Sequence, residues 1–471
     1  MACDTGRLDV TGAWPAEGSL AWRLSHYREG GLAERRRPGE GSPPRVLHVL
    51  SQQPGKTGSG IYLQAIVKHG AAAGYLQRAV IGIPAEASLP DISPIAESDT
   101  FPVRFGTPSL PFPVAGMSDV MPYESTRFSQ FTPEMLDLYL EAFRDVLTGA
   151  TQTFRPDVIH THHLWLVSAL TRLLFPDVPI VTTCHGTELR QLHLVPELAP
   201  FVTPACSGVD RVMALHHEHR QRIADLYAMD PGAIEVIGAG YREDIFCPPG
   251  SSYCPAERKD FLTIVYVGKL SRAKGVPWLI EAMEHVEPPE GRNVRLFLVG
   301  AAAGEERDMI RGKAASQGER VALLGAMSQE RLAGVLKEAD LFVLPSFYEG
   351  LPLVVLESLA CACRVVVTDL PGMDSWLPED LDTLGVVERV PLPRLRGPDT
   401  PEPEDLPAFT ANLAAAISRQ LRRCLCESPD WQDDVLGCIE GMNWRGIFEK
   451  VNGVYQAVLA SGPRSSPEPW R

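Results

Sequence analysis

The sequence predicts an α/β protein built from two parallel-sheet domains that follow one another along the chain. Three observations support this fold class. The chain has 471 residues, which is enough for two or three domains of roughly 150 residues each. Short β-branched and apolar runs alternate with helical spacing, the pattern of strands buried on both faces. The alternation stops at residues 238–259, where GAGYREDIFCPPGSSYCPAERK indicates an interdomain linker, and then starts again.

The elements follow one another in a regular order. Residues 1–44 carry no sustained periodicity and end in ERRRPGEGSPPR, so we expect a flexible N-terminal extension. The first domain, residues 45–245, opens with a strand at RVLHVL, a glycine-bearing loop and a helix at IYLQAIVKHGAAAGY. Its further strands are expected at VIHTH, IVTTCH, VDRVMAL and AIEVIG, and helices at LWLVSALTRLLF and HRQRIADLYAM.

The second domain is expected at residues 246–435, with strands at FLTIVYVG, VRLFLVG, VALLG, ADLFVLPS, RVVVTD and TLGVVERV. The Pro-rich stretch VPLPRLRGPDTPEPEDLP predicts a surface loop within it. Residues 436–471 hold a last amphipathic helix, WRGIFEKVNGVYQAVL, followed by a loose tail.

The charge balance excludes a general nucleic-acid binder. The chain has 44 Lys and Arg against 59 Asp and Glu, a formal net charge of −15, whereas polyanionic partners require a basic face. No run approaches the roughly 18 apolar residues of a membrane span, and the N-terminus lacks a signal-peptide pattern. We therefore expect a cytoplasmic protein with no transmembrane segment, and a peripheral membrane contact stays open. The ten scattered cysteines indicate reduced thiols, without zinc-finger spacing.

The most informative segment is LFVLPSFYEGLPLVVLESLA. An apolar strand ends at Leu344, a short loop carries Glu349 and Gly350, and a helix is expected from Leu351 onward. The first N–H groups of such a helix form an anion site suited to a phosphate. Because Glu349 and Glu357 frame this site, the segment predicts an extended ligand that carries phosphate and hydroxyl groups.

This segment resembles the retaining glycosyltransferases of family four, which have the GT-B fold of two Rossmann-like domains facing a cleft. Glu349 and Glu357 match that family's two glutamates separated by seven residues, with similar residues between them. The resemblance implies that Glu349 holds sugar hydroxyls of a nucleotide-diphosphate sugar and that Glu357 holds the ribose. It also implies diphosphate contacts with the backbone of Gly350, Leu351, Pro352 and Leu353. A solvated helix start with two surface acids is the alternative.

A second motif, IVYVGKLSRAKGVPWLIEA, places Gly268, Lys269 and Lys274 after a strand. Two ammonium groups on one loop can neutralise the charge that develops on a departing diphosphate without any metal. The resemblance implies the same role for the two lysines and a donor contact for Gly268, although the family usually has Arg where this chain has Lys269. An exposed basic loop is the alternative.

The first domain has a glycine-bearing loop, PGKTGSG, between its first strand and first helix. It is not a nucleoside-triphosphate P-loop, because Leu50 occupies the position of the first required glycine. The resemblance implies that Gly58, Ser59 and Gly60 face the donor diphosphate, where small residues allow close approach. A tight strand-to-helix connection remains an equal alternative.

Two polar segments end neighbouring predicted strands, where open α/β sheets bind ligands. They contain His160, His162 and His163 in HTHH, and His185, Gly186, Thr187 and Glu188 in CHGTE. The resemblance implies that His162 contacts the donor sugar; His185, Gly186 and Glu188 are acceptor-side candidates. A zinc site is the rival at HTHH and at the later HHEH, and a core role is the rival for His160. Neither cluster has a second ligand pair at zinc spacing, so we expect no metal.

The resemblance extends over about residues 45–460. It implies that Met327 lies near the nucleotide base and that the last helix crosses back to the first domain. The implied function is transfer of a hexose-type sugar from a nucleotide-diphosphate sugar, a UDP-sugar being favoured, with retained configuration and without metal or cofactor. The acceptor is unidentified: a small molecule, a glycan or a lipid-linked sugar. The insertion at residues 106–131 is either an acceptor-binding loop or an ordered insertion.

Two other classes of function stay open. One is a sugar-nucleotide epimerase or phosphorylase on the same fold, because a fold does not fix a reaction. The other is a catalytically silent sugar-nucleotide-binding or scaffolding protein.

Overall fold

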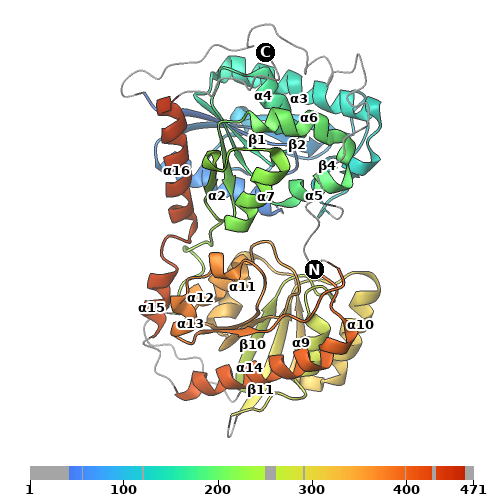
Figure 1. Cartoon of the computed structure of the whole chain (residues 1–471), viewed down its shortest axis with the longest axis vertical. Coiled ribbons are helices and arrows are strands. Elements are labelled where there is room, and N and C mark those ends of the chain that lie inside the picture. Colours follow the sequence, from blue (N-terminus) through green and yellow to red (C-terminus); the bar gives the residue numbers. More distant parts are fainter. Residues whose placement is uncertain are drawn as a thin grey trace. The chain divides into compact units, whose positions relative to one another are not determined.

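The computed structural model describes residues 42–55, 57–118, 121–249, 261–289, 292–397, 399–426 and 431–461. Most of the predicted N-terminal extension and the predicted C-terminal tail therefore lie outside the described residues. The chain forms two compact units, one of residues 1–238 with 447–471 and one of residues 239–446 (Figure 1). Each unit is built on a parallel sheet covered by helices, which confirms the predicted fold class.

The first unit has a seven-stranded parallel sheet in the order β3-β2-β1-β6-β7-β8-β9. Its strands are β1 (Arg45–Leu50), β2 (Leu76–Pro84), β3 (Thr100–Phe105), β6 (Val158–His162), β7 (Ile180–Thr183), β8 (Arg211–Ala214) and β9 (Ile234–Val236). Five of these confirm predicted strands, whereas β2 and β3 were not predicted. The chain moves outward from β1 on one side and from β6 on the other. The point where the order reverses, which is where open sheets bind ligands, therefore lies between β1 and β6.

The helices of the first unit are α2 (Gly58–Ala72), α3 (Pro133–Phe154), α4 (Leu166–Leu174), α5 (Thr187–Leu194), α6 (Ala199–Ser207) and α7 (His217–Tyr227). Two short strands, β4 (Ala115–Gly116) and β5 (Thr126–Arg127), lie in the insertion at residues 106–131. Aromatic residues of this insertion serve the core, because Phe112 is buried against Phe105, and Phe128 is buried against Tyr139 and Trp165. The described residues of the insertion thus pack on the first unit.

The second unit has a six-stranded parallel sheet in the order β12-β11-β10-β13-β14-β15. Its strands are β10 (Phe261–Val267), β11 (Asn293–Val299), β12 (Val321–Gly325), β13 (Leu341–Leu344), β14 (Arg364–Thr368) and β15 (Val387–Val390). Its helices are α9 (Val276–Ala282), α10 (Gly304–Ser316), α11 (Gln329–Lys337), α12 (Leu353–Ala360), α13 (Asp380–Thr383), α14 (Leu406–Cys426) and α15 (Trp431–Cys438). All six strands confirm predicted ones. Here the strand order reverses between β10 and β13.

The last helix, α16 (Trp444–Ser461), begins in the second unit and continues in the first. Within the first unit, Asn452 and Gln456 of this helix bond to the Tyr75 hydroxyl, at 2.5 and 2.8 Å. The unit boundaries fall at residues 238/239 and 446/447, whereas the sequence suggested 245/246 and 435/436. The segment after Gly238 belongs to the second unit because Tyr241 pairs with the backbone of Met442 and Trp444.

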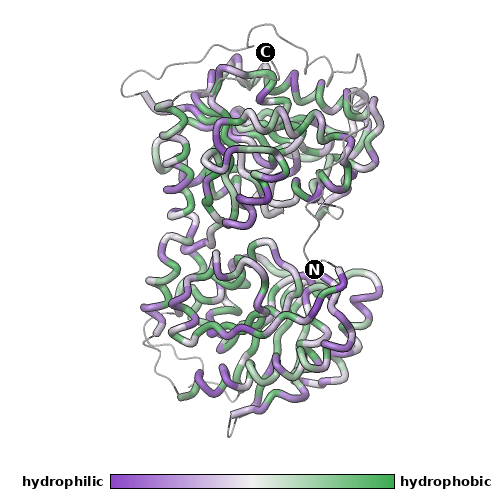
Figure 2. The backbone as a smooth tube through the Cα atoms, viewed as in Figure 1, coloured by the Kyte–Doolittle hydropathy of each residue, from purple (hydrophilic) through white to green (hydrophobic). Residues whose placement is uncertain are grey.

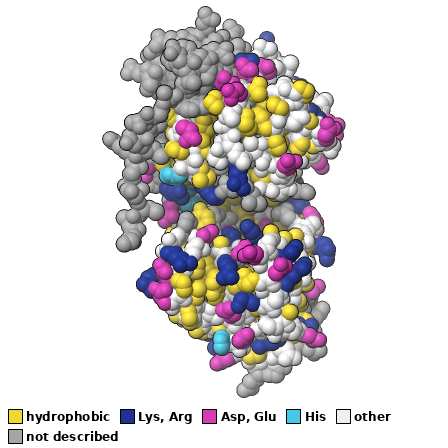
Figure 3. Space-filling model, turned by 90° about the vertical axis from the view of Figure 1, so that its right-hand side faces the viewer, with side chains coloured by type: hydrophobic (Ala, Val, Ile, Leu, Met, Phe, Trp, Pro, Cys, Tyr) yellow, Lys and Arg dark blue, Asp and Glu magenta, His cyan; other side chains and the backbone are white. Residues whose placement is uncertain are grey.

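Hydrophobic residues concentrate in the strands and in the helix faces that cover them, and they form a large core in each unit (Figure 2). Acidic and basic side chains are interspersed over the face shown in Figure 3, so this face carries no extended patch of one sign. Among the described residues, no helix combines the length and the hydropathy needed to span a membrane.

Candidate functional site

The predicted site residues of the second unit follow the two central strands of its sheet. Lys269 and Lys274 lie in the loop after β10, and Glu349 lies in the loop after β13. These strands are the pair between which the strand order reverses, so both loops leave the sheet at its expected ligand-binding edge. The sequence motifs and the topology therefore indicate the same place.

Backbone contacts between the two loops determine where Lys274 lies. The Phe347 N–H donates to the Ala273 carbonyl at 3.0 Å, immediately before Lys274. Immediately after it, Gly275 adopts a left-handed φ of 69° and approaches the Pro345 carbonyl so closely that a Cβ atom would lie 2.0 Å from this oxygen. Only glycine fits such a contact. Lys274 is thus fixed on both sides against the loop after β13.

The Lys274 ammonium is bound to that same loop. Its Nζ lies 2.8 Å from Glu349 Oε2 and donates a second bond of 2.8 Å to the Tyr348 carbonyl. The other carboxylate oxygen of Glu349 accepts a 2.7 Å bond from the Ser346 hydroxyl. With side chains 25% and 17% exposed, the pair is partly desolvated but open to a ligand. A cation and an anion are therefore held side by side, as a ligand carrying phosphate and hydroxyl groups requires.

Lys269 lies differently. Its side chain is exposed and its ammonium group makes no contact with the part of the chain that the structure describes, while its carbonyl accepts a 2.8 Å bond from the Tyr266 hydroxyl. A Cβ atom on the preceding Gly268 would lie 2.7 Å from the Tyr266 hydroxyl, and one on Gly300 would lie 1.8 Å from the Gly268 carbonyl. Both glycines thus allow close packing between the ends of β10 and β11, which gives the predicted donor contact Gly268 a structural role as well.

The helix after Glu349 begins later than predicted. α12 starts at Leu353 rather than Leu351, because Pro352 occupies the N-cap position and disfavours a helical conformation in the residue before it. Gly350 is exposed, and a Cβ atom added there would have no atom within 4 Å. Its lack of a side chain is therefore not needed for packing within this unit.

Glu357 is the other carboxylate of the predicted pair. It lies on α12 and is 8% exposed, and its carboxylate makes no hydrogen bond or ion pair seen among the described residues. Burial raises the pKa of its carboxyl from 4.5 to about 7. A buried carboxyl without a protein partner is costly for the fold, and such groups are concentrated at functional sites.

Met327 lies two residues beyond the end of β12 and is half-buried against the core of the second unit. Its neighbours Leu323 and Leu324 are among the large hydrophobic residues most exposed in the described part of the chain. This edge of the sheet is thus open and apolar, although no contact of Met327 with a ligand is shown.

In the first unit, the glycine loop connects β1 to α2. Thr57 caps the helix by accepting a 3.1 Å bond from the Gly60 N–H. Ser59 is buried, and its hydroxyl accepts a 2.6 Å bond from the Gln52 amide. A Cβ atom on Gly60 would lie 2.4 Å from the Gly55 nitrogen, whereas one on Gly58 would meet nothing within 4 Å.

These two glycines allow a matched test. Gly60→Ala forces backbone atoms of the loop apart, so we expect a loss of about 1–3 kcal/mol in the free energy of unfolding. Gly58→Ala meets open space and restricts the unfolded chain, so it should be neutral or stabilising by up to about 1 kcal/mol. Urea unfolding of both variants measures the difference. Equal destabilisation by both would contradict the loop geometry described above.

Three histidine rings lie close together on the neighbouring strands β1 and β6. His48, His160 and His162 are 0%, 0% and 2% exposed, and burial lowers the pKa of all three. His160 has both ring nitrogens within hydrogen-bond distance of hydroxyls, at 2.7 Å from Tyr455 and 2.8 Å from Thr183. His160 is thus a core residue that ties α16 to the sheet.

His162 differs from its neighbour. Its Nδ1 lies 3.3 Å from His185 Nε2, while its Nε2 has no hydrogen-bond partner among the described residues. His185 follows β7, so the structure brings two predicted site residues together from neighbouring strand ends. A buried nitrogen without a protein partner is what a ligand-contacting side chain presents before its ligand binds.

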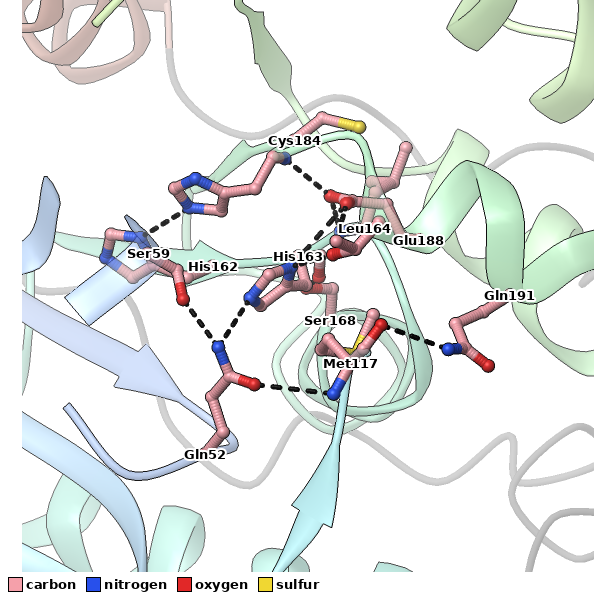
Figure 4. Close-up of polar contacts among 12 residues, drawn as sticks. Gln52, Ser59, Met117, His162, His163, Leu164, Ser168, Cys184, Glu188 and Gln191 are labelled. Carbon is pink, nitrogen blue, oxygen red and sulfur yellow. Dashed lines mark hydrogen bonds and ion pairs between the residues drawn. The ribbon is translucent and has the colours of Figure 1, made fainter. Parts of the chain in front are cut away.

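Glu188 and Gly186 shape the turn that follows β7. Gly186 caps α5 with a left-handed φ of 92°. Glu188 is 0% exposed, and its Oε1 accepts bonds from the backbone N–H groups of His185, at 2.8 Å, and Leu164, at 3.2 Å (Figure 4). Glu188 is therefore committed to contacts within the protein.

The nitrogens of His48, His160 and His162 lie within 4.8 Å of one another, a spacing that could hold a metal ion. However, hydroxyl groups already occupy both nitrogens of His160, and its ring stacks on that of His162 with an interplanar angle of 26°. Near-parallel rings direct their nitrogens poorly toward one centre. At the HHEH segment, His216 caps α7 and His219 contacts Cys184, so these rings have other roles.

Sequence reasoning overlooked several polar residues around these positions. Gln52 follows β1, Ser346 follows β13, and Tyr348 is 54% exposed beside Glu349. The available signal was position, because each follows a strand whose end lies at the ligand-binding edge of a sheet. His163 was recognised only as part of its cluster.

Family models match both units. The model described as "Glycosyl transferase 4-like domain" matches residues 57–240, and the model described as "Glycosyl transferases group 1" matches residues 262–388. Together they cover about two thirds of the chain.

Curated relatives agree with this family. The chain is 27% identical over 237 residues to the D-inositol 3-phosphate glycosyltransferase of Mycobacteroides abscessus, a match covering 46% of this chain and 52% of that protein. It is also 27% identical to the alpha-maltose-1-phosphate synthase of Mycolicibacterium smegmatis, over 64% of this chain and 79% of that protein. The match thus spans about half the length of the first relative.

A solved structure shows the same fold. An Anabaena protein in complex with UDP and glucose aligns with a TM-score of 0.54 at 15% identity, over 88% of this chain and 99% of that chain. This likeness concerns the fold alone. The two family matches, together with two parallel-sheet units whose motifs lie at both switch points, show that the chain belongs to the group 1 glycosyltransferases of family four, which have the GT-B fold.

Proposed function

We propose that the protein transfers a hexose-type sugar from a nucleotide-diphosphate sugar to an acceptor, with retention of configuration and without a metal or cofactor. The observation that carries the proposal is the Lys274–Glu349 pair at the switch point of the second sheet. The ammonium group stabilises the departing diphosphate, and the carboxylate binds sugar hydroxyls. Lys269, exposed on the same loop, adds a second positive charge.

The other parts of the donor are placed against residues that can bind them. The backbone from Gly350 to Leu353 meets the diphosphate, and the Glu357 carboxylate accepts hydrogen bonds from the ribose hydroxyls. Met327 lies beside the base. A UDP-sugar is favoured because the Anabaena protein of the same fold was solved with UDP and glucose. In the first unit, Gly58 and Ser59 face the donor phosphates.

Retention is assigned to attack from the face that the leaving group vacates, assisted by a donor phosphate oxygen. Such a step needs no enzymatic nucleophile, so the protein contributes binding, charge and exclusion of water. His162 contacts the donor sugar, and the segment at His185 and Gly186 faces the acceptor. Removal of metals with EDTA should leave the rate of transfer unchanged.

The donor is tested by ligand-induced stabilisation. A thermal-shift screen against UDP-, GDP- and ADP-sugars should raise the midpoint of unfolding most with a UDP-sugar, because a ligand that binds only the folded state stabilises it. Acceptors are then screened as free sugars, sugar phosphates, glycans and lipid-linked sugars, with release of the nucleoside diphosphate as the readout. Donor binding without transfer or hydrolysis would instead favour a silent sugar-nucleotide-binding protein.

Two glycines of the donor site have opposite expected effects. Gly350→Ala introduces a methyl group that meets no protein atom, so the free energy of unfolding should change by less than about 0.5 kcal/mol. If diphosphate lies against this backbone, the Kd for the donor should nevertheless rise at least tenfold. Gly275→Ala should lower stability itself, because its Cβ would collide with the Pro345 carbonyl. Unchanged donor affinity in Gly350→Ala, measured by calorimetry, would contradict the assigned diphosphate position.

A further inference from the structure

A ring of polar contacts, closed through helix α5, joins four segments of the first unit. The polar ring consists of Gln52, Met117, Gln191, Glu188 and His163 (Figure 4). It connects the residue after β1, the insertion, helix α5 and the residue after β6. All five are buried, with exposures of 0 to 4%. None of them is a predicted donor contact, and only Glu188 was expected near the acceptor.

The direction of the hydrogen bonds around Gln52 is determined by its neighbours. Its Oε1 accepts from the Met117 N–H at 3.4 Å, so its Nε2 is the donor on the other side of the amide. This nitrogen donates to Ser59 Oγ at 2.6 Å and lies 3.2 Å from His163 Nε2. An amide nitrogen cannot accept a hydrogen bond. His163 Nε2 is therefore the acceptor, and the proton of this imidazole sits on Nδ1.

Glu188 completes that arrangement. His163 Nδ1 lies 3.5 Å from Glu188 Oε2, so a protonated nitrogen faces a carboxylate oxygen. Burial by itself raises the pKa of the Glu188 carboxyl, but hydrogen bonds from His163 and from backbone N–H groups outweigh it and hold this pKa below its usual range. The carboxylate is therefore ionised and accepts hydrogen bonds only.

The ring holds backbone that carries proposed site residues. His163 adopts a left-handed φ of 69°, a conformation that is strained in a residue with a side chain. Its carbonyl accepts from the Ser168 hydroxyl at 2.6 Å, and its N–H donates to the Thr183 carbonyl at 2.9 Å. His162 directly precedes this residue, and the His185 N–H donates to Glu188. The positions of His162 and His185 thus depend on the contacts of the polar ring.

We propose that Glu188, through His163 and Gln52, is a positioning residue that holds His162, His185 and the glycine loop in the arrangement needed for sugar transfer. The inference rests on the proposed function. It assigns to Glu188 a role by way of other residues, because a carboxylate that is 0% exposed and bonded within the protein does not reach an acceptor. This role depends on the polarity of the ring, that is, on which of its atoms donate hydrogen bonds and which accept them.

The proposal is tested by substitutions that exchange hydrogen-bond donors and acceptors on the two sides of His163. Glu188→Gln places an amide donor against the His163 Nδ1–H, and Gln52→Glu places an acceptor-only group against His163 Nε2. Glu188→Gln leaves donors on both sides of His163, which no form of the imidazole satisfies, and Gln52→Glu leaves carboxylates on both sides, which favour the charged imidazolium. Each single variant therefore removes the neutral Nδ1–H form, so kcat should fall at least tenfold while the KM for the donor stays within twofold. The double variant lets His163 accept on Nδ1 and donate from Nε2. It should recover kcat to within about threefold of the wild type.

The control is His193→Gln, an exposed position on the same helix outside the ring, whose kcat should equal that of the wild type. If kcat of the double variant falls by the product of the two factors lost in the single variants, the proposal is overturned. A raised acceptor KM with unchanged kcat in Glu188→Gln would also overturn it, because this is the signature of direct acceptor contact.

Stability provides a readout that does not depend on the reaction. The free energy of unfolding lost in the single variants should be regained in the double variant, and if Glu188→Gln does not fold, the double variant should fold again. If the double variant does not regain this free energy of unfolding, the proposal is overturned. If the wild-type protein transfers no sugar from any donor, the proposed function fails, whereas the polarity of the ring is still decided by this measurement.

Discussion

Lys274→Ala is expected to lower kcat/KM at least about 30-fold, which corresponds to roughly 2 kcal/mol of transition-state stabilisation. The reason is geometric as well as electrostatic. The ammonium group is held by Glu349 and by the Tyr348 carbonyl at 2.8 Å each, so it is in place before the donor binds and needs no rearrangement as charge develops. Lys269→Ala should cost less, because that side chain is exposed.

Steady-state kinetics with the donor identified by thermal shift measure this loss. Lys274→Arg keeps the charge and should retain part of the activity. Lys313→Ala, which removes a surface ion pair with Glu281, is the matched control and should change kcat/KM less than twofold. Turnover of Lys274→Ala at the wild-type rate would remove the ammonium from the proposed mechanism.

Glu357→Gln is expected to stabilise the protein at pH 8 by an amount on the order of 3 kcal/mol. The pKa of this carboxyl is raised from 4.5 in water to about 7 by burial. Between these values the folded protein keeps a proton that the unfolded chain has released, so stability is fully present below pH 4.5 and is lost as the pH rises through 7. Glutamine cannot ionise, so the variant does not lose this stability.

Urea unfolding at pH 5, 6, 7 and 8 tests the expectation. The two proteins should have similar stability at pH 5 and diverge as the pH rises, whereas Glu305→Gln, on the exposed first turn of α10, should follow the wild type. Parallel curves for wild type and Glu357→Gln would show that Glu357 is not the buried, unpartnered carboxyl described here.

The same carboxyl should make donor binding depend on pH. If ribose hydroxyls donate to the ionised group, the affinity for a nucleotide sugar should increase from pH 6 to pH 8 in the wild type and stay flat in Glu357→Gln. Glu357→Ala should lose at least about 2 kcal/mol of transition-state stabilisation, because the partner of the ribose is gone. A nucleotide sugar is the right probe, since the terminal phosphate of a free nucleoside diphosphate itself titrates near pH 6. Residues that bind substrate but lower the stability of the folded protein are common at functional sites.

The second unit was predicted from the sequence more completely than the first. Its strands are continuous apolar runs such as FLTIVYV and RVVVT, which local composition identifies, and all six were predicted. In contrast, β2 begins with the exposed and half-buried residues Leu76 to Arg78, and β3 contains Pro102, so neither has the uniform apolar pattern of a buried strand. Local composition therefore gave no sufficient signal for these two strands.

The residues of the candidate site also divide into those that the sequence predicts and those that it does not. Lys274, Glu349 and Glu357 belong to motifs with fixed spacing, so sequence alone could bring them into one hypothesis. The Gln52–His163 contact joins residues 111 positions apart and the His163–Glu188 contact joins residues 25 apart, both through buried polar atoms, and no local pattern predicts such contacts. Likewise Gly60 and Gly268 were expected to face ligand, whereas tight contacts with the chain's own backbone and side chains explain them.

The central claim is that a nucleotide-diphosphate sugar is bound mainly by the second unit and that its sugar is passed to an acceptor with retained configuration. The most direct measurement follows the anomeric proton of a UDP-sugar by NMR in the presence of an acceptor mixture, with wild type and Lys274→Ala side by side. The claim predicts that the wild type forms a product with the anomeric configuration of the donor while UDP appears in equal amount, and that Lys274→Ala is much slower. A product of inverted configuration, or no binding of any nucleotide sugar at millimolar concentration, would contradict it.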